Sequence, residues 1–192
     1  MQTPSIEALD MNVIETERLL LKELRPEVMT MLMTGGYTDV QLMKVLGVDE
    51  SGLVTEKDNF SKGLTNYRLS FRAFVMVEKA TGMVIGRCGY HMWYLQHARA
   101  EIGYALTDGA AKRKGLMTEA IRAIIAYGFD VMRLNRIEAM VGTANVPSLR
   151  ILKGCGFKEE GLLRSHYCKD GRMEDSLIFS LLRHEYFAQS AG

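Results

Sequence analysis

A short basic segment between a strand-like run and an amphipathic helix carries the clearest chemical signature in the sequence. Lys112, Arg113 and Lys114 precede Gly115, and from Met117 onward apolar residues recur at the three-and-four spacing of one helical face. A helix that starts directly after such a turn presents free backbone N–H groups and the positive end of its dipole. Together with the cationic side chains, these groups predict a binding site for a phosphorylated ligand.

The elements around this segment are expected to alternate between strands and helices. Residues 100–106 form a strand-like run that enters the basic segment, and residues 136–141 alternate as a strand after the helix. Asn145 then starts a short helix with Pro147 in its first turn, and Gly154 stands at its end. The segment is therefore expected to be held between two strands and followed by a second helix.

Turn sequences predict two hairpins elsewhere in the chain. Residues 79–82 join the β-rich runs 74–78 and 83–90, and Asp170-Gly171 lies between two later strand-like runs, residues 162–168 and 173–182. The remaining expected elements are a strand at residues 17–22 and two or three helices between residues 26 and 67. Hairpins with interposed helices indicate a mixed α/β domain built on one sheet.

Composition narrows the class of protein. The chain has 192 residues, which suits a single domain, and we expect a flexible lead-in at residues 1–14 followed by one domain at 15–188. Lys and Arg number 24 against 23 Asp and Glu, so we expect no nucleic-acid partner. No long apolar run and no signal-peptide pattern is present, which predicts a soluble, cytoplasmic protein without membrane contact. Three cysteines and four histidines show no ligand spacing, so we expect no metal.

Three segments, taken in order, resemble one known family. They are residues 15–24 (ETERLLLKEL), the central EIGYAL followed by KGLMTEAIRAII, and residues 145–157 (NVPSLRILKGCGF). Over residues 15–187 the chain resembles GNAT-fold N-acetyltransferases, specifically the RimJ/RimL-type branch. The resemblance implies an α/β (α+β) fold with helices flanking a mostly antiparallel sheet of six or seven strands. It also implies a splay between the fourth and fifth strands, here residues 100–106 and 136–142, that acetyl-CoA enters as co-substrate.

The resemblance also implies which residues bind the cofactor. The backbone of Tyr104, Ala105 and Leu106 would hydrogen-bond the pantetheine arm as an additional strand does. Asn145 would hydrogen-bond the same arm. The pyrophosphate would bind the turn formed by Ala111, Lys112, Arg113, Lys114, Gly115 and Leu116.

The phosphate turn departs from the family pattern Q/R-x-x-G-x-G/A. Ala110, Arg113 and Gly115 occupy its three fixed positions, so the leading polar residue and the middle glycine are absent. If the middle position requires a positive φ, an arginine there costs about 1 kcal/mol. Alternatively, Arg113 and its basic neighbours replace amide contacts by charge-assisted hydrogen bonds. We expect phosphate binding to be retained; the alternative is a solvated basic turn.

Acetyl transfer to an amine requires three events: the ammonium loses a proton, the thioester carbonyl is polarised and the departing thiolate is protonated. The resemblance makes Glu101 the candidate base, acting directly or through water. The alternative is an ordinary strand carboxylate paired with Arg87 or Arg99. Ser148 is the candidate proton donor to the thiolate. For Ser148 and Asn145 the alternative is capping of the helix that they begin.

Aromatic side chains leave two questions open. Other GNAT branches use a tyrosine as the acid, but Tyr104 and Tyr127 are not on the matching helix. A cluster after the expected third strand could line an acceptor pocket or pack a sheet edge; its members are His91, Trp93, Tyr94 and His97.

The leading hypothesis is an acetyl-CoA-dependent N-acetyltransferase that acts on a primary amine by direct transfer. The acceptor would be a peptide N-terminal α-amine or a small molecule such as an amino acid, a polyamine or an aminoglycoside. Two alternatives remain: a non-catalytic acyl-CoA-binding module and an interaction protein that has lost the cofactor site. The resemblance also makes a homodimer an assembly to test.

Overall fold

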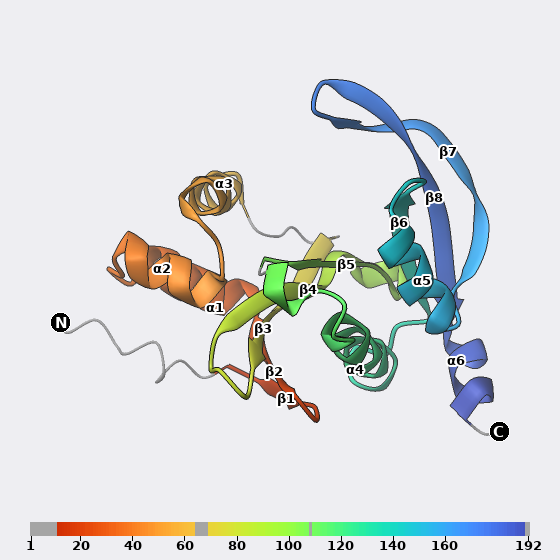
Figure 1. Ribbon diagram of the computed structural model, residues 1–192, viewed down its shortest axis with the longest axis horizontal. Helices are drawn as coiled ribbons and strands as arrows, with labels where there is room; N and C mark the ends of the chain where they lie inside the picture. Colours follow the sequence, from red (N-terminus) through yellow and green to blue (C-terminus); the bar gives the residue numbers. More distant parts are fainter. Residues whose placement is uncertain (1–10, 64–68, 108, 191–192) are drawn as a thin grey trace.

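One sheet of eight strands organises residues 11–63, 69–107 and 109–190, which are the residues described by the computed structural model (Figure 1). The strand order is β1-β2-β3-β4-β5-β6-β8-β7. The strands are β1 (Val13–Glu15), β2 (Leu19–Leu24), β3 (Leu69–Glu78), β4 (Val84–Tyr94), β5 (Arg99–Leu106), β6 (Arg136–Gly142), β7 (Lys158–Lys169) and β8 (Arg172–Leu182). The helices are α1 (Pro26–Thr34), α2 (Asp39–Leu46), α3 (Glu50–Ser61), α4 (Leu116–Asp130), α5 (Val146–Gly154) and α6 (Arg183–Ser190), with 3-10 turns η2 (Leu95–His97) and η3 (Gly109–Ala111).

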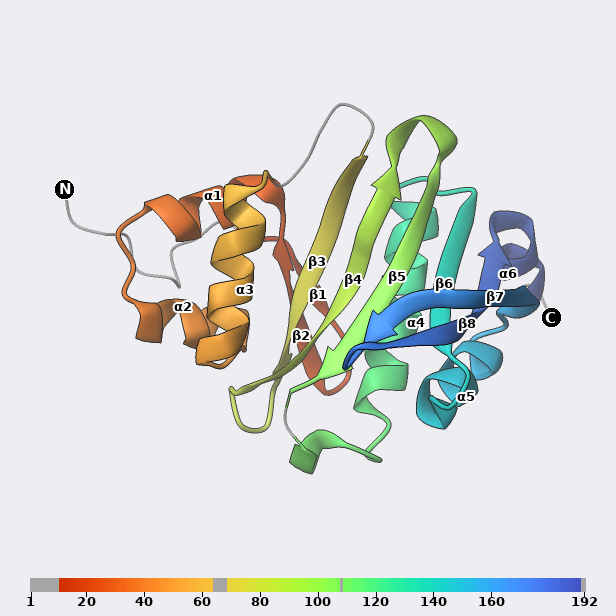
Figure 2. The same cartoon turned by 90° about the horizontal axis from the view of Figure 1, so that it is seen from above.

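Helix α4 packs on one face of the sheet, whereas α1, α2 and α3 pack on the opposite face (Figures 1 and 2). The alternation of side chains along β3 sends Phe74 and Met76 into the core beneath α4, whereas Val75 packs with α1, α2 and α3 on the opposite face. The apolar face of α4 is buried as its periodicity predicts, with Ile121 and Ile124 fully inaccessible. The phosphate-turn segment is therefore anchored by a helix that packs on the central strands.

The N-terminal expectation was wrong at its boundary. Residues 13–15 form β1, which pairs antiparallel with β2, so the expected lead-in does not extend to residue 14. Ile14 is partly buried against the core beneath α4, and this burial favours the strand. With β1 the sheet has eight strands, where six or seven were expected.

The local turn predictions are confirmed. Residues 79–82 connect β3 to β4 with Gly82 at φ +67°, and Asp170 and Gly171 both have positive φ between β7 and β8. Two successive positive φ values are those of a tight type I′ hairpin turn, which suits the right-handed twist of paired strands. Three helices occupy residues 26–61, in agreement with the expected two or three.

The expected splay is confirmed between β5 and β6. These parallel strands pair only from Arg99 opposite Arg136 to Glu101 opposite Glu138, and no pairing joins them further along in the described chain. The buried Glu138 carboxylate holds the closed end, since it accepts from Arg99 Nη1 and from Arg136 Nε, each at 2.7 Å. Strands β5 and β6 therefore separate immediately beyond the residues that these ion pairs hold together.

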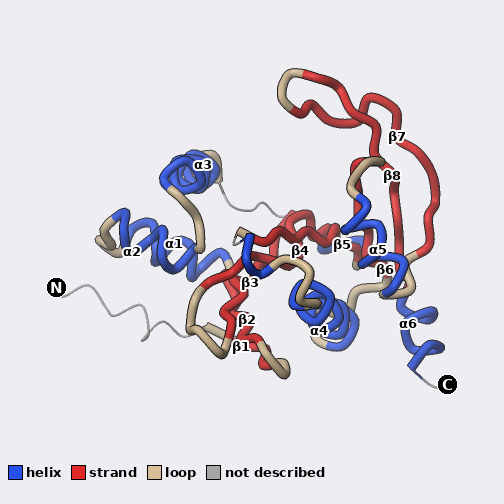
Figure 3. The backbone as a smooth tube through the Cα atoms, in the orientation of Figure 1, coloured by secondary structure: helices blue, strands red, loops and turns tan. Residues whose placement is uncertain are grey.

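The β7–β8 hairpin extends beyond its neighbours and curves over the open part of the splay (Figures 1, 2 and 3). Tyr167 of β7 reaches the β6 backbone: a Cβ on Gly142 would lie 2.8 Å from its hydroxyl oxygen. The hairpin therefore forms one wall above the separated strands.

In the described part of the chain, no helix has the length and apolarity needed to cross a bilayer.

Candidate active site

A pocket of about 600 Å³ occupies the region where β5 and β6 separate. Four elements contribute to its wall besides β5 and β6: β4, the start of α5, and the two strands of the β7–β8 hairpin. The candidate residues that line it are Glu101, Tyr104, Asn145 and Ser148. The structure thus brings together the predicted catalytic pair and two of the predicted cofactor contacts.

The alternation along β5 divides these groups between two faces. Ile102 is buried, and Tyr104 packs on the core beneath α4, so both point to the side of the sheet that carries α4. Glu101 and Gly103 point to the other side, beneath the β7–β8 hairpin. A ligand in the splay therefore meets Glu101 on one face of the sheet and Tyr104 on the other.

Glu101 lies in the pocket wall with a side chain that is 17% exposed. Neither arginine proposed as its ordinary partner contacts it: Arg87 pairs with Glu56, and Arg99 pairs with Glu138. Its partner is His91, whose Nε2 lies 3.2 Å from Glu101 Oε1. The carboxylate is therefore left beside an imidazole rather than a permanent cation.

The aromatic cluster is divided between the pocket wall and the core, and its members on β4 do not pack a sheet edge, because β4 is an interior strand. His91 and Tyr94 line the pocket, whereas Trp93 packs against the core with the Arg72 guanidinium 5.2 Å from its ring centroid. His97 lies in the 3-10 turn η2, outside the pocket wall. Two of the four residues thus face the site.

At the start of α5 the capping interpretation is confirmed for Asn145. Its Oδ1 accepts from the backbone N–H of Ser148 at 3.3 Å, which leaves the side-chain NH₂ able to donate into the pocket. The Tyr104 hydroxyl oxygen lies 3.5 Å from the Ser148 carbonyl oxygen. Burial raises the pKa of Tyr104 to about 12, against an opposing hydrogen bond with Ser148, so this phenol is protonated at neutral pH.

The basic turn leads directly into the N-terminus of α4. Arg113 has φ +63° and Gly115 has φ +77°, so two residues of the turn occupy the left-handed region. Gly115 is the N-cap of α4 and supplies no capping side chain, so the first helical N–H groups are not occupied in this way. Lys112 and Lys114 are exposed beside Arg113, whereas Ala111 and Leu116 are buried and anchor the turn.

The residues present fit acetyl-CoA. Tyr104, Ala105 and Leu106 pair with β4 on one side, and the side facing β6 has no pairing in the described chain. This open backbone edge is able to hydrogen-bond an extended arm. The cationic turn with its uncapped helix N-terminus lies beyond the end of the same strand. Groups for the arm and for the phosphates therefore follow one another along the chain.

Sequence reasoning missed a contact that holds the turn. Arg18 donates from Nε to Glu119 Oε2 at 2.7 Å and from Nη1 to the Lys114 carbonyl at 2.9 Å. Thr16 Oγ1 donates to the other Glu119 oxygen at 2.6 Å. The only available signal was that these residues lie in two of the segments quoted for the resemblance, ETERLLLKEL and KGLMTEAIRAII.

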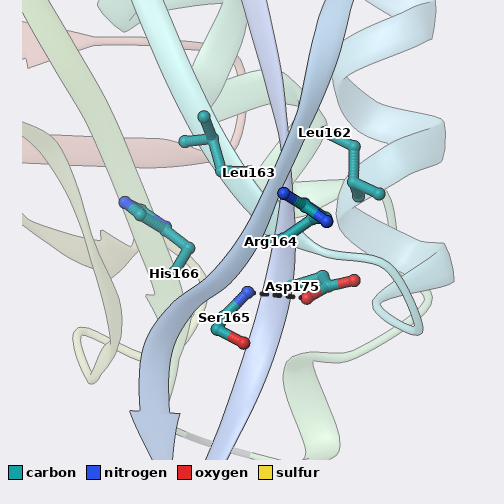
Figure 4. A pocket seen from close by; sticks show the side chains of 6 residues that line it. All are labelled: Leu162, Leu163, Arg164, Ser165, His166 and Asp175. Carbon is teal, nitrogen blue, oxygen red and sulfur yellow. Dashed lines mark hydrogen bonds between the residues drawn. The ribbon is translucent and has the colours of Figure 1, made fainter.

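The β7–β8 wall was also missed. Between Leu163 and Tyr167, β7 has two more residues than the facing stretch of β8 has between Ser176 and Glu174. Within this irregular stretch Ser165 has φ +48° and donates its backbone N–H to Asp175 at 2.7 Å. Figure 4 shows this bond among the side chains that line a second hollow, which has a volume of about 840 Å³ and is formed by residues 162–166 of β7 and Asp175 of β8. His166 lines both this hollow and the splay pocket, and its Nδ1 lies 3.0 Å from Ser176 Oγ.

Among residues 11–63, 69–107 and 109–190, no group of three or more His, Cys, Asp or Glu side chains is arranged to hold a metal ion.

Comparison with known proteins identifies the family. Residues 18–158 match the family described as acetyltransferase (GNAT) domain. The uncharacterized N-acetyltransferase p20 of Bacillus licheniformis is 35% identical over 178 residues, covering 92% of this chain and 99% of that protein. The spermidine/spermine N-acetyltransferase SpeG of Vibrio cholerae has a similar fold, with a TM-score of 0.67 at 20% identity over 90% of this chain and 97% of that one. A GNAT-family acetyltransferase from Bacillus anthracis aligns with a TM-score of 0.64 at 23% identity, over 91% of this chain and 100% of that one. The chain belongs to the GNAT family of N-acetyltransferases.

Proposed function

We propose that this enzyme acetylates a primary amine that enters the splay beneath the β7–β8 hairpin, while acetyl-CoA binds from the face that carries α4. The observation that carries this proposal is the division of β5: Glu101 faces the hairpin, and Tyr104 faces α4 and the start of α5. A base on one face, and the proton donor Ser148 beside Tyr104 on the other, suit a direct transfer between two ligands that meet in the splay.

Acetyl-CoA supplies the acetyl group as a thioester. The backbone edge of Tyr104, Ala105 and Leu106 holds the arm, with the Asn145 side-chain NH₂ as a further donor. The phosphates bind the N-terminus of α4 and the cationic turn, where Arg113 stands at the position of the family's middle glycine and has a left-handed conformation. Arg113 thereby combines the backbone shape of a glycine with a positive charge.

Glu101 removes the proton from the acceptor ammonium, directly or through water, because it is the pocket carboxylate that no arginine neutralises among those described. Ser148 donates a proton to the departing sulfur. The Tyr104 phenol lies beside this residue, with its oxygen 3.5 Å from the Ser148 backbone carbonyl, and remains protonated at neutral pH. Proton removal and proton donation are thus assigned to different elements, β5 and α5.

We place the enzyme in the RimJ/RimL-type branch, for which the support is the ETERLLLKEL segment and the final β7–β8 hairpin. This branch makes a peptide N-terminal α-amine the first acceptor to test. The fold shared with SpeG, which acts on spermidine and spermine, makes a polyamine the second. Both acceptors present the same primary amine to Glu101.

The test is an acceptor screen with acetyl-CoA, using short peptides of varied N-terminal residue, spermidine and free amino acids. Glu101→Gln should lower kcat at least tenfold while calorimetry shows an unchanged Kd for acetyl-CoA. Glu27→Gln is the matched control, because Glu27 is 74% exposed on α1, away from the pocket. Equal loss of activity in both variants, or unchanged activity in Glu101→Gln, would contradict the assigned base.

A homodimer is part of the proposal. β7 lies at the edge of the sheet, and Leu162 of β7 and Met173 of β8 are half exposed. An edge strand with exposed apolar side chains is a surface that a second copy can cover. Sedimentation equilibrium checks it: a mass near twice the 21.6 kDa of the chain is expected, and a monomer at micromolar concentration would contradict it.

A further inference from the structure

We infer that His91 is the relay through which Glu101 passes the acceptor's proton to solvent, so that the working base is a Glu101–His91 pair. This inference rests on the proposed function of the splay pocket. Three independent features carry it: a strand irregularity at His91, a glycine that seats the ring, and a difference in exposure between the two side chains.

A β-bulge in β4 lies at His91, which lines the pocket. Tyr90 pairs with Ile102, but the next pair is Met92 with Glu101, so two residues of β4 lie opposite a single residue of β5. His91 is the additional residue. The Tyr90 hydroxyl donates to the Ile124 carbonyl of α4, so alternation directs the next residue, His91, to the pocket face. The bulge makes Met92, another pocket residue, the one opposite Glu101, and such bulges are frequent beside active sites.

Gly103 seats the imidazole ring against β5. A Cβ on Gly103 would lie 2.7 Å from His91 Nδ1, a distance that no ordinary side chain permits. The other ring nitrogen, Nε2, lies 3.2 Å from Glu101 Oε1. The ring therefore lies along the pocket face of β5, from Gly103 to Glu101, and contacts both residues.

The two side chains differ in their access to water. The Glu101 side chain is 17% exposed, whereas the His91 side chain is 54% exposed. A carboxylate is a weak base at neutral pH, whereas an imidazole takes up and releases protons there. The arrangement thus connects a sheltered carboxylate, which meets the amine, to an exposed group that exchanges protons with solvent.

The proton balance is as follows. One N–H bond of the acceptor ammonium breaks, and its proton binds a Glu101 oxygen. The carboxylic acid passes that proton to Nε2 of a neutral ring that carries its hydrogen on Nδ1, and the resulting imidazolium releases the Nδ1 proton to solvent. Exchange of ring protons with water then returns the remaining hydrogen from Nε2 to Nδ1, which restores the starting pair. One proton enters the pair and one leaves it, and no other reactant is needed.

Other titratable groups line the same pocket and must be separated from His91 in the test. They are Glu101 and Tyr104 of β5, Tyr94 of β4, and His166 and Tyr167 of β7. His166 is hydrogen-bonded with Ser176, and Tyr167 donates to Glu174 at 2.7 Å. His166 is the second imidazole, so a variant of it is required.

The experiment compares pH–rate profiles of the parent with those of His91→Gln, His91→Ala, His166→Gln and His97→Gln. Glutamine retains a hydrogen bond to Glu101 but cannot carry a proton. We expect His91→Gln to lower kcat ten- to a hundredfold near neutral pH, to abolish the acidic limb of the profile, and to leave the calorimetric Kd for acetyl-CoA unchanged. Free imidazole should restore activity to His91→Ala. His97→Gln, in η2 outside the pocket, should match the parent.

A His91→Gln variant with the parent's kcat and pH profile would overturn the relay, and so would loss of the acidic limb in His166→Gln alone. Activity retained in His91→Gln but lost in His91→Ala would also overturn it, because this result would show that hydrogen bonding alone is required. A parent that binds acetyl-CoA but acetylates no amine would contradict the proposed function, and the relay with it.

Discussion

Arg18 Nε lies 2.7 Å from Glu119 Oε2, and this ion pair joins the turn between β1 and β2 to the first turn of α4. The Arg18 backbone N–H and the Thr16 hydroxyl also donate to Glu119, at 2.8 and 2.6 Å. Burial disfavours the charged form of Glu119, but these donors together hold its pKa below the ordinary value. Because Arg18 also holds the Lys114 carbonyl, the position of the basic turn depends on a segment nearly a hundred residues earlier in the chain.

Arg18→Ala is therefore predicted to weaken acetyl-CoA binding without impairing the chemical step. The KM for acetyl-CoA should rise roughly five- to twentyfold with kcat within about twofold of the parent, because Arg18 contacts the turn and not the pocket. Arg18→Lys should recover only part of this loss, since an ammonium cannot reproduce the fork of the guanidinium. Steady-state kinetics with varied acetyl-CoA checks both variants. Arg172→Ala, at the exposed tip of the β7–β8 hairpin, is the control.

Arg113→Gly should change stability and affinity in opposite directions. Arg113 has φ +63°, so a glycine there should relieve about 1 kcal/mol of backbone strain and raise Tm by about 2–4 °C. Loss of the guanidinium should weaken acetyl-CoA binding severalfold, most strongly at low salt. Thermal unfolding and calorimetry at two salt concentrations measure these effects. Lys112→Ala removes a neighbouring charge for comparison, and tighter binding by Arg113→Gly would show that backbone amides dominate the site.

Gly103→Ala is expected to separate His91 from Glu101 while the fold persists. The new Cβ would lie 2.7 Å from His91 Nδ1, and the obstructed group is a half-exposed side chain that can rotate away. We predict at least a tenfold loss of kcat with Tm within a few degrees of the parent. Activity assays measure the change in kcat, and thermal unfolding curves measure the change in Tm. Gly161→Ala, where an added Cβ would contact nothing within 4 Å, should be silent.

Glu160 should make stability pH-dependent in acid. The hydrogen bond from Arg136, then that from Ser180, hold its pKa at about 2, below the ordinary 4.5. Because the folded-state pKa is the lower one, the contribution is fully present above pH 4.5 and is lost as pH falls toward 2. It should not exceed about 1 kcal/mol, since the Glu160 side chain is 40% exposed and screened by solvent.

Urea unfolding of the parent and of Glu160→Gln between pH 6 and pH 2 tests this expectation. The difference in free energy of unfolding between the two proteins should shrink as pH decreases below 4.5. A difference that stays constant over this range would mean that the Arg136–Glu160 ion pair adds nothing to stability.

Most elements of the fold were predictable because their signals are local. The buried face of α4 follows the apolar spacing after Gly115, and both hairpin turns follow glycine-containing tetrapeptides that accept positive φ. Capping by Asn145 was likewise foreseen as an alternative, since a cap involves residues three apart. β1 was missed because a three-residue strand exists only through its pairing with β2.

The sequence by itself determined the order of the elements, the cluster of positive charge before α4 and the carboxylate on the strand that leads to it, since each depends on neighbouring residues. Only the tertiary structure decided which groups meet: Glu101 with His91 beside a one-residue bulge, and Arg18 with Glu119 across a hundred positions. A bulge shifts pairing by a single residue, and a long-range ion pair depends on how whole elements pack. Neither leaves a periodic signal along the chain.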